Sequence, residues 1–236
     1  YLTVYDNVED GIVLASDATD AALHALTAHD NGAYGIYVAS RITRLAASTA
    51  YDNETGIYVS SSAGGDPVVV GSAAPDGTPD LSLGLGNRVY NNRLRGIDAR
   101  YNVLVYGNTA FGQAGNGDVG IYLYSAAAAR HNVAYDNYDG IVVQYGSTVE
   151  ANRLFHNVRY GLSCNYGCEV AANAVYANQT GIYLGGSFSG GVRNNLVYAN
   201  LQTALQAYSV SSVDLHGNTF HEPTGDAVVI EGGANN

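Results

Sequence analysis

Residues 132–143 read NVAYDNYDGIVV, residues 152–164 read NRLFHNVRYGLSC and residues 173–184 read NAVYANQTGIYL. In each stretch an asparagine precedes an aromatic residue, a second asparagine follows, and the stretch ends in Gly-Ile or Gly-Leu. The glycine of this Gly-Ile or Gly-Leu element recurs at Gly11, Gly35, Gly56, Gly96, Gly120, Gly140, Gly161 and Gly181. Alanine takes its place at Ala204 and Ala227. Successive positions lie 20–24 residues apart, except for one step of 40. The chain is therefore built from an internal repeat.

Each repeat contains three short apolar runs, of which the third is seen at Val149 and Val170. Gly, Asn, Asp and Ser separate the runs, and these residues favour turns over helices. A unit of this size cannot bury its apolar side alone, so successive units must stack. We therefore predict an all-β parallel β-helix of about ten coils, in which asparagines and aromatic rings form ladders between coils. Leucine-rich repeats and β-propellers do not fit, because the L-x-x-L-x-L frame and a period near 40 are missing.

The composition excludes several classes of protein. The 236 residues carry a net charge of −11, and all ten basic residues are arginine. Without basic clusters the chain is a poor ligand for nucleic acid or for an anionic membrane surface. No run approaches the roughly 20 apolar residues of a membrane span. We expect residues 1–236 to form a single domain, taken from a longer chain because it opens on Tyr1.

The N-x-V-Y-x-N-x-x-x-G-I repeat resembles the repeats of the pectate-lyase-like superfamily over about residues 5–231. Within it, the chain is similar to the group containing the copper-site accessory protein NosD and the mannuronan C5-epimerases. The resemblance implies a right-handed β-helix and, for the enzymes of the superfamily, polysaccharide chemistry along an exposed strand face. Fold alone does not imply function, because one scaffold hosts many activities.

The catalytic patterns of those enzymes are missing. Asp66-Pro67 is followed by Val-Val and not by His-Glu, as the epimerase pattern requires. The sequences after Asn108 and Asn218 lack the aspartate of the pectin-hydrolase pattern, and the absence of lysine leaves the pectate-lyase set incomplete. Whether the chain is an enzyme is therefore left open.

Strand alternation points to one surface on which side chains suited to sugars would gather. The expected glycan-binding set is Tyr58, Asp98, Arg100, Tyr122, Tyr124, Gln144 and Asn165. Aromatic faces with amides, one acid and one arginine suit stacking and hydrogen bonding to a sugar ring. For catalysis, Asp98 or Tyr122 would be the base and Arg100 would stabilise charge. The alternative is structural, because tyrosines favour strands and Asp98 could simply pair with Arg100.

The 40-residue step contains an insertion within residues 61–86, SSAGGDPVVVGSAAPDGTPDLSLGLG. Long loops that leave a regular scaffold are often functional. We expect a surface loop that either forms a wall of the site or extends from the rod without contributing to the site.

No cofactor is required by any motif. Asp6, Asp30 and Asp52 share one position in consecutive repeats, as does Asp136, so a carboxylate ladder could hold Ca²⁺. Single aspartates at turns more often cap the local backbone, and no metal site is assigned. Cys164 and Cys168 flank Asn-Tyr-Gly, and we expect a disulfide, with two buried thiols as the alternative.

These features predict an extracellular or cell-surface β-helix module with a structural or adhesive role that binds polysaccharide along its tyrosine-rich face. The alternative is a polysaccharide lyase or C5-epimerase acting on uronate-containing glycans. The expected partners are a polysaccharide or a neighbouring surface protein. The open sheet edges at the ends of a β-helix also predict end-to-end self-association.

Overall fold

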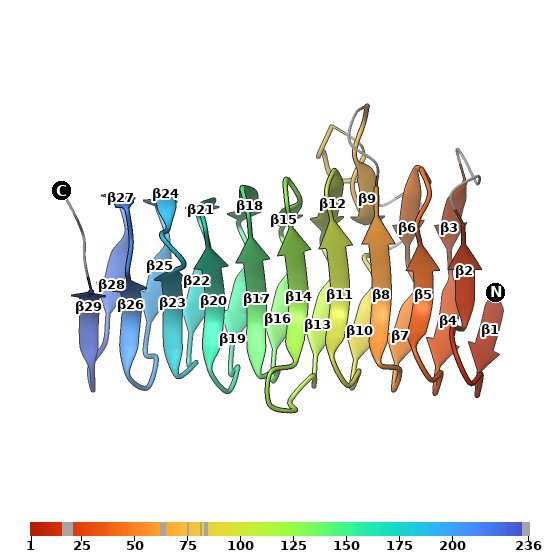
Figure 1. Cartoon of the computed structure of the whole chain (residues 1–236), viewed down its shortest axis with the longest axis horizontal. Helices are drawn as coiled ribbons and strands as arrows, with labels where there is room; N and C mark the ends of the chain where they lie inside the picture. Colours follow the sequence, from red (N-terminus) through yellow and green to blue (C-terminus); the bar gives the residue numbers. More distant parts are fainter. Residues whose placement is uncertain (16–20, 62–64, 75, 81, 83–84, 233–236) are drawn as a thin grey trace.

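Three parallel sheets wind around one core to form a rod (Figure 1). The computed structural model describes residues 1–15, 21–61, 65–74, 76–80, 82 and 85–232. Each coil contributes one strand to each sheet, and the chain then returns to the first sheet one coil further along. The prediction of a parallel β-helix is confirmed. The described residues form nine complete coils and two strands of a tenth, close to the ten expected.

The first sheet contains ten strands: β1 (Leu2–Tyr5), β4 (Leu26–His29), β7 (Thr49–Tyr51), β10 (Arg88–Tyr90), β13 (Thr109–Phe111), β16 (Val133–Tyr135), β19 (Arg153–Phe155), β22 (Ala174–Tyr176), β25 (Leu196–Tyr198) and β28 (Thr219–His221). The second sheet contains ten: β2 (Ile12–Leu14), β5 (Tyr34–Val38), β8 (Thr55–Ser60), β11 (Arg95–Arg100), β14 (Val119–Tyr124), β17 (Asp139–Gln144), β20 (Tyr160–Asn165), β23 (Thr180–Gly185), β26 (Thr203–Tyr208) and β29 (Asp226–Glu231). The third contains nine: β3 (Ala22–His24), β6 (Arg44–Ala46), β9 (Val68–Gly71), β12 (Val103–Tyr106), β15 (Ala128–Arg130), β18 (Ser147–Glu150), β21 (Cys168–Ala171), β24 (Ser189–Arg193) and β27 (Ser212–His216).

The repeat residues occupy the positions that the alternation predicts. Ile57, Ile97 and Ile121 lie in register in the second sheet, point into the rod and are fully buried. Successive coils therefore stack identical apolar positions on one another, and the core runs through the rod without a break. This regularity fixes which side chains of each strand face outward.

Two of the three corners are held by ladders of buried amides. The first corner joins the first sheet to the second, the second corner joins the second to the third, and the third corner returns the chain to the next coil. At the first and third corners, the backbone N–H and side-chain NH2 groups of most ladder residues donate to the side-chain oxygen of the next. The third corner contains Ser48, Asn87, Asn108, Asn132, Asn152, Asn173, Asn195 and Asn218. The first corner contains Asn7, Asn31, Asn53, Asn92, Gln113, Asn137, Asn157, Asn178, Asn200 and finally Glu222. The predicted asparagine ladders are thus confirmed.

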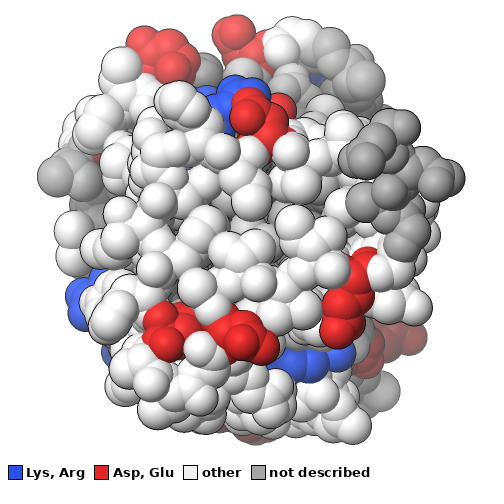
Figure 2. Space-filling view, turned by 90° about the vertical axis from the view of Figure 1, so that its left-hand side faces the viewer, with Lys and Arg blue, Asp and Glu red and all other residues white. Residues whose placement is uncertain are grey.

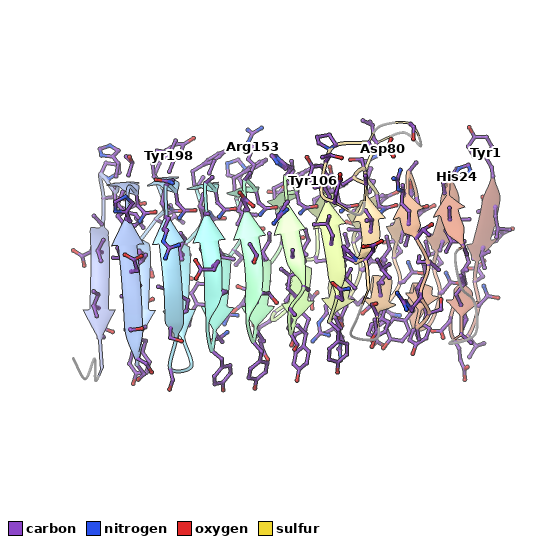
Figure 3. All side chains as sticks on the ribbon, turned by 90° about the horizontal axis from the view of Figure 1, so that it is seen from above. Tyr1, His24, Asp80, Tyr106, Arg153 and Tyr198 are labelled. Atoms are coloured by element: carbon purple, nitrogen blue, oxygen red, sulfur yellow. A yellow bond between two sulfur atoms is a disulfide. The ribbon has the colours of Figure 1, made fainter. Side chains whose placement is uncertain are left out.

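Aromatic rings form another ladder, on the outside of the first sheet. Neighbouring ring centroids lie 4.6–5.2 Å apart and the ring planes differ by 2–16°, so the rings stack face to face. The members are Tyr5, His29, Tyr51, Tyr90, Phe111, Tyr135, Phe155, Tyr176 and Tyr198. Arg153 stacks beside the ladder and lies on the same side of the rod as Tyr198 (Figure 3).

The second corner has a different chemistry. In the seventh coil a disulfide joins Cys164 in β20 to Cys168 in β21, as expected. Both cysteines are buried. In the preceding coil Val143 and Ser147 occupy the equivalent positions. The disulfide therefore closes the inside of a corner that has no amide ladder.

The predicted insertion is divided by a strand of the regular coil, because β9 lies within residues 61–86. After β9, Ala73 packs on the outside of the third sheet against Val69, Leu104 and Tyr106. Asp80 pairs with Arg44 of β6 at 2.7 Å. Residues 62–64, 75, 81 and 83–84 lie outside the described residues. The described part of the insertion after β9 therefore covers the third sheet and not the outward side of the second.

The C-terminal end of the rod has a largely uncharged centre with acidic side chains around it (Figure 2). Val228 and Ile230 are 40% and 52% exposed, although they continue rows that are buried in earlier coils. End-to-end self-association stays a prediction. Within the described residues, no helix is long and apolar enough to span a bilayer.

Replacing Asn152 by alanine tests the amide ladder. The change removes the acceptor of Asn132 and the side-chain donor to Asn173, while the backbone N–H of residue 152 still donates to Asn173. We expect the free energy of unfolding to fall by about 3 kcal/mol, because each buried polar group left unpaired costs about 1–3 kcal/mol. Urea denaturation followed by circular dichroism measures the change. The control Asn116→Ala alters an exposed turn residue and should change stability by less than about 0.5 kcal/mol. Equal effects of the two substitutions would contradict this role of the ladder.

Candidate functional site

The structure brings the seven predicted site residues onto one surface, the outward side of strands β8 to β20. Tyr58, Asp98 and Tyr122 pair directly across β8, β11 and β14. A second row continues from Arg100 through Tyr124, Gln144 and Asn165. We call the outward side of β5 to β23 the tyrosine face. Sequence alternation alone was sufficient to place these residues together.

Asp98 is the charged centre of this face, yet only 2% of it is exposed. The Arg100 guanidinium donates to both carboxylate oxygens, with Nε–Oδ1 and Nη2–Oδ2 distances of 2.9 and 3.0 Å. Arg95 donates to Oδ2 from the other side. Burial of a carboxylate is tolerated when it is paired and hydrogen-bonded in this way. Both oxygens of Asp98 are therefore occupied by cations of its own strand.

Tyrosine rings cover these arginines. The guanidinium carbon of Arg95 lies 3.9 Å from the ring centroid of Tyr122, and that of Arg100 lies 5.2 Å from Tyr58. These distances suit cation–π attraction. Further along, Tyr37 stacks on Tyr58 with centroids 4.9 Å apart. The face is thus a patch of rings and guanidinium groups over one buried acid.

The protonation of this patch disfavours the catalytic roles considered for it. Hydrogen bonding to Asp98 raises the pKa of the Arg100 guanidinium above its ordinary value. Burial raises the pKa of the Tyr122 phenol, against the opposing charge of Arg95. A tyrosine base must lose its proton near the working pH, so the shift at Tyr122 acts against that role. The raised pKa of Arg100 preserves its charge, and both oxygens of Asp98 already accept hydrogen bonds from Arg95 and Arg100.

A second acid–arginine cluster on the same face was missed by sequence reasoning. Asp139 is 1% exposed and accepts from Arg159, whose Nε lies 2.9 Å from Oδ1. The Arg159 guanidinium lies between Tyr138 and Tyr160, 4.8 and 4.4 Å from their ring centroids. Asp139 and Tyr160 each directly precede the repeat glycine, a position that the alternation argument did not consider.

Asp118 is another buried acid outside the predicted set. It lies in a longer turn before β14 and accepts from the Gly115 N–H at 3.1 Å. Burial raises the pKa of its carboxyl group. A single carboxyl group held by its own turn provides no pair of groups for acid–base catalysis.

Three exposed tyrosines at the second corner were also missed. Tyr101, Tyr145 and Tyr166 follow the last residues of β11, β17 and β20. Each stands five residues after a repeat glycine, and this constant offset is the signal that could have found them. They extend the tyrosine face around the corner.

The aspartates considered for calcium lie at the first corner. Asp6, Asp30 and Asp52 have φ angles of 58, 54 and 55°, the left-handed conformation that aspartate tolerates in tight turns. They line a depression together with Arg93. Among the described residues there is no group of three or more His, Cys, Asp or Glu side chains that could hold a metal ion. Calcium binding therefore stays a prediction, and turn geometry accounts for these residues.

The comparisons with known proteins agree with the fold. A family model described as periplasmic copper-binding protein (NosD) matches residues 76–228, more than half of the chain. The chain belongs to the NosD family. The expected resemblance is therefore confirmed for this NosD-family chain. No curated protein sequence matches it.

Two solved structures share its β-helix. The A-module of mannuronan C-5 epimerase AlgE4 from Azotobacter vinelandii superposes with a TM-score of 0.62 at 12% identity, covering 89% of this chain and 63% of the module. The A-module of AlgE6 from the same organism gives 0.58 at 14% identity, with 89% and 62% covered. The NosD-family chain thus spans less than two thirds of either module. At these identities the likeness shows the fold alone.

The family description raises the question of copper, and the residues present do not fit such a site. Copper is held in proteins by thiolate, thioether and imidazole groups. This chain has no methionine, both of its cysteines are in the disulfide, and its described residues offer no clustered histidines. No chemistry of the tyrosine face is therefore derived from copper.

The pKa shifts on the tyrosine face predict an alkaline loss of stability. Burial raises the phenol pKa values of Tyr122 and Tyr160 in the folded chain, whereas the unfolded phenols ionise at about pH 10. The stability that comes from the neutral phenols is complete below pH 10 and is lost as the pH rises through the folded-state values. Urea midpoints should fall above about pH 10, and less steeply for Tyr122→Phe than for the wild type. A pH profile that Tyr122→Phe leaves unchanged would contradict this explanation.

Proposed function

We propose that this chain is a non-catalytic β-helix module that binds polysaccharide on its tyrosine face, in a structural or adhesive role. The observation that carries the proposal is the environment of Asp98. Its two oxygens accept from Arg95 and Arg100, and the same contact keeps Arg100 protonated. Both oxygens of Asp98 are thus engaged within the protein, and the raised pKa of the Tyr122 phenol opposes its loss of a proton.

The composition of the face supports binding to a sugar polymer. Rings provide apolar surface, and Gln144 and Asn165 provide half-buried amides that both donate and accept hydrogen bonds. Asp139 and Arg159 neutralise each other, whereas Asp98, paired with both Arg95 and Arg100, leaves one net positive charge on the face. Regular coil spacing repeats this chemistry along the rod, which suits a repetitive polymer.

The proposed location is outside the cytoplasm, in the periplasm or beyond it. Disulfides persist in oxidising compartments, and Cys164 and Cys168 form one. The description of the family, a periplasmic copper-binding protein, supports the same location.

Affinity electrophoresis through gels containing neutral or acidic polysaccharides tests the binding. We expect the wild type to be retarded by at least one polymer. The double variant Arg100→Ala, Tyr122→Ala should bind about tenfold more weakly, because it removes a guanidinium and a ring from the face. The control Arg153→Ala, Tyr176→Ala removes an equivalent arginine–tyrosine contact, 2.6 Å from Nε to Oη, from the first sheet. This control should retain full binding.

Three results would count against the proposal. Retardation of the wild type by none of the polymers would remove the binding function. Equal loss in both double variants would show that the tyrosine face is not the site. Ultraviolet-absorbing unsaturated products, or altered epimer content, after incubation with uronate polymers would show that the chain is an enzyme.

A further inference from the structure

Four tyrosines form a continuous strip at the second corner. The ring centroids of Tyr101 and Tyr124 lie 5.9 Å apart, those of Tyr124 and Tyr145 5.4 Å apart, and those of Tyr145 and Tyr166 4.7 Å apart. These residues belong to four consecutive coils, from the one containing β11 to the one containing β20. The strip, which we call the corner strip, therefore runs along the length of the rod.

The corner strip and the aromatic ladder of the first sheet differ in the parts of their rings that are accessible. In the ladder the rings are nearly parallel and cover each other's faces. In the strip, two of the three contacts are edge-on, at 85° and 75°. Tyr101, Tyr145 and Tyr166 are 43%, 44% and 51% exposed. The third contact, between Tyr145 and Tyr166, is face to face at 7°, so these two rings cover one face of each other. The exposed remainder of the three rings provides the apolar surface that packs against a sugar.

The backbone conformation indicates that tyrosine is present at these positions for its side chain and is not required by the turn. Tyr101, Tyr145 and Tyr166 have φ angles of 64, 60 and 66°, a region that bulky residues rarely adopt. At the equivalent position of other coils, Ser125 and Ser209 adopt this conformation with φ angles of 50 and 52°. Small residues thus satisfy the turn. The turn requires the left-handed conformation but does not require a bulky residue, so tyrosine at this position points to a functional side chain.

The surroundings of the strip define the chemistry of its ligand. A depression of about 290 Å³ beside Tyr166 is also lined by Thr148, Glu169 and Ser189. Hydroxyl and carboxylate oxygens accept hydrogen bonds from the hydroxyl groups of a sugar. Glu169 pairs with Arg193 at 3.4 Å, and the net charge of −11 opposes a polyanion. The site therefore favours an uncharged, hydroxyl-rich chain.

We propose that the corner strip binds a neutral glycan chain lying along the second corner, parallel to the axis of the rod, with its sugar rings on Tyr101, Tyr145 and Tyr166. The Asn102 amide donates to the Gly65 carbonyl at 2.9 Å, so Gly65 of the insertion lies beside the residue that follows Tyr101. This inference rests on the proposed function, and adds the orientation and the charge class of the polysaccharide.

Affinity electrophoresis in hydroxyethylcellulose, a neutral glucan, and in polymannuronate tests the inference. The variant Tyr145→Ala, Tyr166→Ala removes two exposed rings at a position that the small residues Ser125 and Ser209 occupy in other coils. The control Tyr51→Ala, Tyr90→Ala removes two stacked rings, 4.8 Å apart, from the ladder. Circular dichroism verifies that both variants are folded. We expect the corner variant to bind hydroxyethylcellulose about tenfold more weakly and the ladder variant to bind like the wild type.

The outcomes separate this inference from the proposed function. If neither polymer retards the wild type, the glycan-binding function and the inference both fail. If the wild type binds and the corner variant binds equally well, the inference alone is wrong. Stronger binding of the wild type to polymannuronate than to hydroxyethylcellulose would overturn the assignment of a neutral ligand.

Discussion

A buried amide must find hydrogen-bond partners inside the protein, and this requirement holds each coil in register with the next. Asn152 accepts from Asn132 and donates to Asn173, and the same relation repeats along two corners of the rod. A shift of one residue would leave the amides unpaired and turn the core isoleucines outward. The ladders therefore fix which residues of every coil reach the surface.

The second corner is not subject to this constraint, because its described residues form no amide ladder. It instead contains the disulfide and the corner strip. On the first sheet the tyrosine rings stack in parallel, so they cover each other's faces and contribute to the packing of the rod. At the second corner two of the three contacts are edge-on, and Tyr101, Tyr145 and Tyr166 are 43–51% exposed. The proposal thus gives the same residue type two roles, according to ring geometry and exposure.

Much of this arrangement follows from the sequence, because the repeat spacing dictates strand register. The spacing predicted the coils, both asparagine ladders, the aromatic ladder and the grouping of Tyr58, Asp98 and Tyr122 on one face. The period alone could not show that Arg95 approaches Asp98 from the other side, or that Asp139 and Arg159 form a second cluster. Those contacts depend on side-chain conformations. The corner tyrosines were not predicted because alternation applies to strand residues and not to the turn residues that follow them.

The division between architectural and ligand-binding tyrosines can be measured directly by NMR of the tyrosine ring protons during titration with cellohexaose, a soluble neutral glucan. The account predicts that the signals of Tyr101, Tyr145 and Tyr166 shift with a common saturation curve, whereas those of Tyr51, Tyr90 and Tyr135 stay in place. Shifts that saturate on the ladder tyrosines while the corner signals remain unchanged would contradict it.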